Sequence, residues 1–161
     1  MDYNYDQTLD QFLKERNRIT DEQINELSRV HAIEGGGWAG HFVDAGIISE
    51  NDLVKLIIES AKIPYLPIIN AVISNDLIEE FTIDFLQTFE CCPFERIGPL
   101  ITIITPNPFQ PELVRSRTNK IQKVELFVCR VGEWREVMKR IMDDIASKKK
   151  ATAASKAKKK K

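Results

Sequence analysis

Apolar and polar positions in the first third of the chain follow the same pattern twice, with an offset of 29 residues. Each copy has apolar residues at helical spacing, then a reversal, then a polar stretch that begins a second helix. The matching positions are Leu9, Leu13, Asn17, Ile19, Thr20, Gln23, Ile24 and Leu27 in the first copy, and Trp38, Phe42, Gly46, Ile48, Ser49, Asp52, Leu53 and Leu56 in the second. Repeats of this size usually bury a core by packing on one another, so the pattern predicts a helical tandem-repeat subdomain over residues 1–62.

Polar residues at equivalent places in the two copies predict where the helices begin. The segment Thr20–Gln23 fits a capping box, and Ser49–Asp52 is a looser version of it, so helices should begin near residues 21 and 50. Asn17 and Gly46 precede these starts, and both residue types tolerate the left-handed conformation that ends a helix. Pro64 should end the last helix of the pair.

After Pro64 the pattern alternates between short helices and apolar, β-rich runs. The predicted elements are helices at Asn75–Phe81, Ile83–Phe89 and Pro111–Asn119, strands at Cys91–Ile97, Leu100–Thr105 and Val124–Cys129, and a last helix with an apolar stripe of Trp134, Val137, Met138, Ile141 and Ile145. Residues 63–146 therefore read as a small α/β sandwich with about three strands. Together with the helical repeat, they predict the α+β class.

Charge is distributed unevenly along the chain. Residues 147–161 contain eight lysines and no acid, at Lys148, Lys149, Lys150, Lys156, Lys158, Lys159, Lys160 and Lys161. Of the 23 basic residues, 15 remain elsewhere against 24 acidic ones, so the rest of the chain is acidic. Because this Lys-rich segment has nothing to bury, we expect a disordered tail. It could contact an anionic lipid surface, a nucleic acid or an acidic partner, or serve only to keep the chain soluble.

The rest of the composition points away from catalysis. The chain is 43% apolar and 29% charged, which is ordinary for a globular domain, and its acidic start at Asp2 is not a secretory signal, so we expect a cytoplasmic protein. Cys91, Cys92 and Cys129 are in apolar runs and read as buried free thiols. The sequence contains no phosphate-binding Gly-x-x-x-x-Gly-Lys-[Ser/Thr] loop, no Gly-x-Ser-x-Gly and no metal-ligand spacing. We therefore expect no enzyme activity and no cofactor.

The order of these elements resembles the N-terminal domain of the type II secretion and type IV pilus assembly ATPases. The segment Phe42–Leu53 follows that family's helical unit, Leu-Gly-x-x-Leu-Val-x-x-Gly-x-Ile-[Ser/Thr]-x-x-x-Leu. Ile63–Ile68 is similar to its apolar–proline–aromatic link, and Leu100–Pro108 to its Leu-x-Val-Ala-x-x-Asp-Pro strand and turn. The resemblance covers about residues 8–146, and it implies a docking role without the ATPase core.

Some members of this family bind cyclic di-GMP through units that begin Arg-Leu-Gly, and the resemblance makes that ligand an alternative. Here Thr8 and Gly37 occupy the arginine positions, and Asp10 and Ala39 occupy the glycine positions, which argues against an anionic dinucleotide. If a degenerate site is used, its residues are Trp38, Phe42, Val43, Gly46 and Leu53.

Three hypotheses follow. The first is a non-catalytic interaction or regulatory module that binds a secretion or pilus ATPase, or an inner-membrane platform protein, and that the tail could hold at the inner face of the membrane. The second is a cyclic di-GMP receptor with a degenerate motif. The third is a nucleic acid or membrane-surface binder that acts through its lysine tail.

Overall fold

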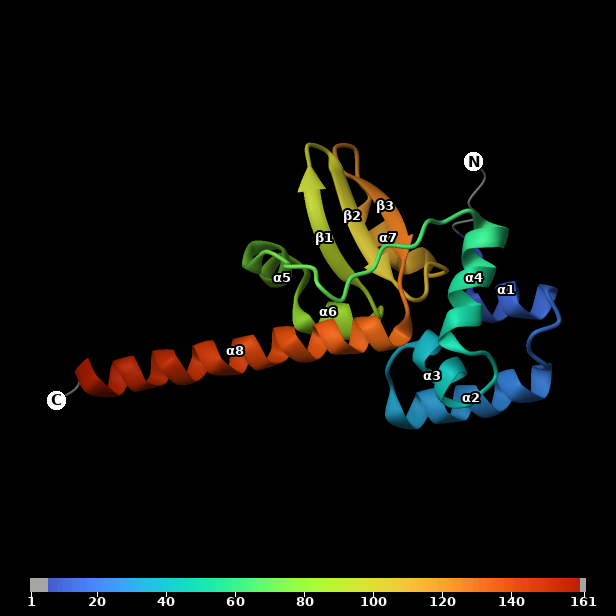
Figure 1. The fold of residues 1–161 in the computed structure, drawn as a ribbon, viewed down its shortest axis with the longest axis horizontal. Coiled ribbons are helices and arrows are strands. Elements are labelled where there is room, and N and C mark those ends of the chain that lie inside the picture. Colours follow the sequence, from blue (N-terminus) through green and yellow to red (C-terminus); the bar gives the residue numbers. More distant parts are fainter. Residues whose placement is uncertain (1–5, 160–161) are drawn as a thin grey trace.

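The computed structural model describes residues 6–159, which contain eight helices and three strands in an α+β arrangement (Figure 1). In chain order these are α1 (Leu9–Glu15), α2 (Asp21–Glu34), α3 (Trp38–Asp44), α4 (Glu50–Ala61), α5 (Asn75–Phe81), α6 (Ile83–Thr88), β1 (Cys92–Ile97), β2 (Leu100–Thr105), α7 (Pro111–Arg117), β3 (Lys123–Val128) and α8 (Val131–Lys159). The predicted fold class is confirmed, and each predicted strand is present to within one residue at either end.

The first four helices form the two units of the repeat. The reversal residues Asn17 and Gly46 both have positive φ, at 56° and 73°. The next helix begins four residues later in each unit, where the Thr20 hydroxyl accepts from the Gln23 amide and the Ser49 hydroxyl accepts from the Asp52 amide. Equivalent positions therefore produce equivalent local structure, because the backbone conformation and the cap are set by the same residue types.

The sheet has the order β1-β2-β3 and is mixed. β1 and β2 are joined by the turn at Gly98 and pair antiparallel, whereas β2 and β3 are parallel, with α7 in the connection between them. Trp134, near the start of α8, donates from its indole Nε1 to the carbonyl oxygen of Cys91 at 3.0 Å. This bond ties α8 to the base of β1, and Figure 1 shows the strands rising from the first half of α8.

Two clusters of buried apolar side chains form the core. One contains Phe12, Phe42 and Leu53 of the helical repeat. The other lies between the sheet, α5 to α7 and the first turns of α8. The first cluster also includes Phe109 and Val128, so the α/β part contributes side chains to the core of the repeat. The division of the chain after residue 62 stays a prediction.

The Lys-rich segment differs from the expectation of disorder, because α8 continues through it to Lys159. The segment contains no glycine or proline, and alanine and lysine have high helix propensity. The helix continues without burial, since residues 146–155 are all exposed. Lys160 and Lys161 lie outside the described residues.

The three cysteines are buried and unpaired, as predicted. Burial raises the pKa of the Cys92 thiol to about 12, and it raises the pKa of Cys91 and Cys129 well above the ordinary range. Within residues 6–159, none of the helices has the length and apolar character that crossing a membrane requires.

Candidate functional site

The five residues expected for a degenerate dinucleotide site lie together in the second repeat unit. Phe42 and Leu53 are almost fully buried in the core, and Gly46 forms the reversal between α3 and α4. Trp38 and Val43 are half-buried and pack against the same core. The Trp38 ring stacks on the His31 ring with 4.4 Å between their centroids. These residues therefore make a packed helical core, in which little side-chain surface is free for a ligand.

A buried carboxylate occupies the N-terminus of α3. Glu90, which is 2% exposed, accepts from the backbone amides of Ala39 and Gly40 at 2.9 and 3.0 Å. A Cβ added at Gly37 would lie 1.7 Å from the Glu90 side chain, so only glycine allows this approach. Burial raises the pKa of Glu90, although the two amide bonds act in the opposite direction. The first amides of α3, where an external anion would bind, already have an acceptor from this chain.

A second contact joins α3 to α8 beside Glu90. The Arg135 guanidinium donates to both carboxylate oxygens of Asp44, at 2.9 and 2.7 Å. The Arg135 guanidinium holds the pKa of the Asp44 carboxyl below its usual range. The sequence interpretation missed Glu90 and this ion pair. The one available signal was the position of Glu90, an acid directly beside the apolar residues Phe89 and Cys91.

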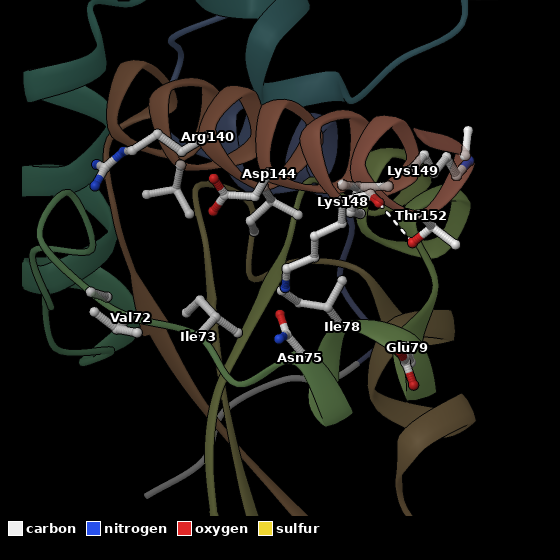
Figure 2. Close-up of a pocket in the computed structure, with 15 residues that line it drawn as sticks. Val72, Ile73, Asn75, Ile78, Glu79, Arg140, Asp144, Lys148, Lys149 and Thr152 are labelled. Carbon is white, nitrogen blue, oxygen red and sulfur yellow. Dashed lines mark hydrogen bonds between the residues drawn. The ribbon is translucent and has the colours of Figure 1, made fainter. Parts of the chain in front are cut away.

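A large hollow lies between α8 and the chain at residues 71–79 (Figure 2). We call it the α8 groove, and its volume is about 820 Å³. Its floor is apolar and consists of Ile73, Ile78, Val137, Ile141 and Ile145. Val72 lies at the edge with 92% of its surface exposed. Such a concave apolar surface is typical of a binding site.

Charged residues border this groove unevenly. Arg140, Lys148 and Lys149 contribute three positive charges along α8, and Asp144 and Glu79 contribute two negative ones. Figure 2 shows the Lys148 side chain extending across the groove toward Asn75. From residue 147 to residue 155 the chain has no acid, so the α8 wall of the groove is most positive at its C-terminal end.

The predicted tail lysines thus have separate positions. Lys148 and Lys149 border the groove, and Lys150 is exposed on α8. Lys156, Lys158 and Lys159 belong to the last turns of the helix. The sequence interpretation did not place any lysine beside an apolar surface, because it assigned no role to the opposite wall. The sequence feature that could have indicated the groove was Ala71-Val72-Ile73, an apolar run to which no packing partner was assigned.

Comparisons with known proteins agree with the fold. No protein-family model and no curated protein matches the sequence. Among solved structures, the N-terminal domain of XpsE is similar over 80% of this chain and 90% of that chain, with 18% identity and a TM-score of 0.54. The structure of MshE with cdg is similar over 80% of this chain and 94% of that chain, with 14% identity and a TM-score of 0.50. The chain has the fold of the N-terminal domains of these secretion and pilus ATPases, as the sequence resemblance predicts.

Proposed function

We propose that this chain is a non-catalytic docking module that binds a component of a secretion or pilus system, either an ATPase motor or an inner-membrane platform protein. The observation that supports this proposal most directly is the α8 groove, an open apolar surface on a fold like the N-terminal domain of XpsE. A groove with an apolar floor and charged edges suits a protein segment.

The ionisable groups of the structure support a role without chemistry. A nucleophilic cysteine needs a lowered pKa, whereas burial raises the pKa of all three thiols. Glu90 is buried, but both of its oxygens already accept amide hydrogen bonds. Asp44 and Glu80 are paired with Arg135 and Arg96. Each of these three carboxylates has a hydrogen-bond or ion-pair partner in the structure that accounts for it.

A dinucleotide receptor is the second candidate, because the similar MshE structure is one with cdg. The Glu90 carboxylate weighs against it, since a negative charge at the start of α3 would repel a phosphate. Calorimetry with cyclic di-GMP tests this candidate, and we expect no heat of binding at high micromolar ligand. Binding that survives Glu90→Gln and is lost with Trp38→Ala would favour the receptor.

Affinity capture from native lysate tests the docking proposal. Two baits are compared by mass spectrometry: the full chain, and a variant of it in which Lys148, Lys149 and Lys150 are changed to Gln. We expect the full chain to capture a secretion or pilus ATPase or a platform protein. Capture of only ribosomes, nucleic acid or lipid, lost with the lysine changes and in high salt, would instead support a tail-driven binder.

A further inference from the structure

We propose that the α8 groove binds an amphipathic helix of a partner protein, with apolar side chains along one face and acidic side chains at the end that lies over Lys148 and Lys149. This names the chemical class of the partner in the docking function proposed above, and it rests on that function. Length, shape and charge of the groove each support it.

The length of the groove fits a helix of several turns. α8 borders the groove from Val137 to Ala153. At a rise of about 1.5 Å per residue this wall is about 24 Å long. The bordering residues of α8 recur at intervals of three and four, so they form one continuous face. A partner helix of about 16 residues would run along that face over its whole length.

The shape of the groove favours a helix over a lipid surface. Val137, Ile141 and Ile78 form the floor and are 3%, 7% and 9% exposed, so their remaining surface is reached only from within the groove. The side chains of a helix can insert between α8 and the 71–79 segment, whereas a bilayer surface is flat on this scale. Val72, which is 92% exposed at the edge, would lie against the inserted helix.

The charge of the groove predicts the charge of the partner helix. The end of the groove at Lys148 and Lys149 has no acid on α8 from residue 147 onward. An acidic end of the partner would gain favourable contacts there, and a basic end would be repelled. The same consideration argues against α8 of a second copy lying parallel in the groove, because its lysines would lie against these lysines. Asp144 lies on α8 between Arg140 and Lys148, where the proposed helix contributes its apolar face, and Glu79 is the one acid on the opposite wall near Lys149 among the described residues that line the groove (Figure 2).

A display library tests the proposal on the full chain. Its members are helices of about 18 residues with Leu, Ile, Met or Phe fixed along one face and Glu, Lys, Gln or Ser varied elsewhere. We expect selection to enrich Glu over Lys at one end of the helix. Enriched peptides should bind Val72→Asp, and the double variant Lys148→Glu/Lys149→Glu, about tenfold more weakly than the unchanged chain. Ile33→Asp, at an 86% exposed position on α2, is the matched control and should bind like the unchanged chain.

Three results would overturn the proposal. One is selection of no binder or of binders without an acidic preference, and another is binding that both groove variants leave unchanged. The third is that no helix is selected, while the chain binds vesicles of phosphatidylcholine and phosphatidylglycerol and the groove variants do not. That result would identify a lipid surface as the ligand of the groove. The docking function is tested separately by affinity capture. A motor or platform protein captured equally by the unchanged chain and by Val72→Asp would leave that function standing and remove the groove from it.

Discussion

The two repeat units begin with equivalent helices, yet the helices are capped by different parts of the molecule. At the start of α1 the Gln11 side chain accepts from the Thr8 amide at 3.0 Å, so the cap is complete within four residues. At the start of α3 the cap residue is Gly37, and the free amides donate to Glu90, about 50 positions further along the chain. The first helix of the first unit is capped by residues of that unit, whereas the first helix of the second unit is capped by a residue of the α/β part.

This difference means that the α1 cap should stabilise only its own helix, whereas the α3 cap should also stabilise the tertiary structure. A change at the α1 cap should affect one short helix, because its partners are all in that helix. A change at the α3 cap also removes a contact between the helical repeat and the chain leading into β1, so it should lower the stability of both parts. Substitutions at the two caps, taken in order of their predicted cost in stability, test that contrast.

Gly37→Ala should be the most destabilising change. The new methyl group would overlap the Glu90 side chain, displacing the carboxylate and leaving the Ala39 and Gly40 amides without their acceptor. We expect the free energy of unfolding to fall by about 3 kcal/mol. A change at the equivalent position of the first unit, Thr8→Gly, should cost only about 0.3 kcal/mol. Urea denaturation of both variants measures the difference.

A double-mutant cycle controls for other effects of the methyl group. Glu90→Ala removes the side chain that Gly37→Ala would strike, so the double variant should be less destabilised than the sum of the two single variants. Simple additivity would mean that the cost of Gly37→Ala arises elsewhere, and the proposed dependence of α3 on Glu90 would be wrong.

Glu90→Gln should have the next largest effect. Both carboxylate oxygens accept from an amide, and a carboxamide presents its NH₂ group to one of these donors. We expect a loss of about 2 kcal/mol in the free energy of unfolding, against about 1 kcal/mol or less for Gln11→Ala at the equivalent cap. Equal costs at the two sites would remove the contrast between local and tertiary capping.

The same variant allows a test of pH dependence. Because burial raises the pKa of Glu90 in the folded chain, the folded state binds its proton more tightly than the unfolded state does. The stability that this proton contributes is fully present when the pH is below the pKa of Glu90 in the unfolded chain. It is lost as the pH rises through the pKa of Glu90 in the folded chain. Urea midpoints at pH 5 and pH 8 should therefore show that the unchanged chain loses more stability on this rise than Glu90→Gln. The opposite order would show a lowered pKa.

Thr20→Ala and Ser49→Ala should have smaller and similar effects. These residues occupy the same position in the two units, and each hydroxyl accepts one amide hydrogen bond, at 3.2 and 3.1 Å. We expect each change to cost about 1 kcal/mol by thermal or urea unfolding. Ser28→Ala is the control, because this hydroxyl only donates to a carbonyl within α2 and should be nearly neutral. A much larger cost at Ser49 would show that the α4 cap has further partners.

The sequence predicted those parts of the fold that depend on local patterns. The strands, the helix Asn75–Phe81 and the reversals at Asn17 and Gly46 follow from alternation, caps and residue type, and the structure confirms them. Glu90 could not be predicted in the same way, because its partners are about 50 residues away and a single acid gives no periodic signal. The groove was missed for a similar reason, since one wall is the irregular 71–73 segment.

The lysine segment shows two local rules in competition. The expectation of disorder gave weight to the absence of large apolar residues after Ile145. The structure follows helix propensity, which is high for alanine and lysine, and it extends a helix whose first turns are already packed. Because the helix is nucleated by the packed residues, each further turn avoids the cost of starting a new helix.

Ala151→Pro should therefore change the helix content and leave the overall stability nearly unchanged. Proline at this position removes the amide hydrogen bond of α8 just beyond its packed half, where the surrounding side chains are exposed. We expect a smaller helical circular dichroism signal and a change in the free energy of unfolding of at most about 0.5 kcal/mol. Glu136→Pro, also at an exposed position but within the packed turns, should cost about 3 kcal/mol or more. Similar costs for both changes would show that the second half of α8 packs on the body of the protein, and then the groove would have a covered wall.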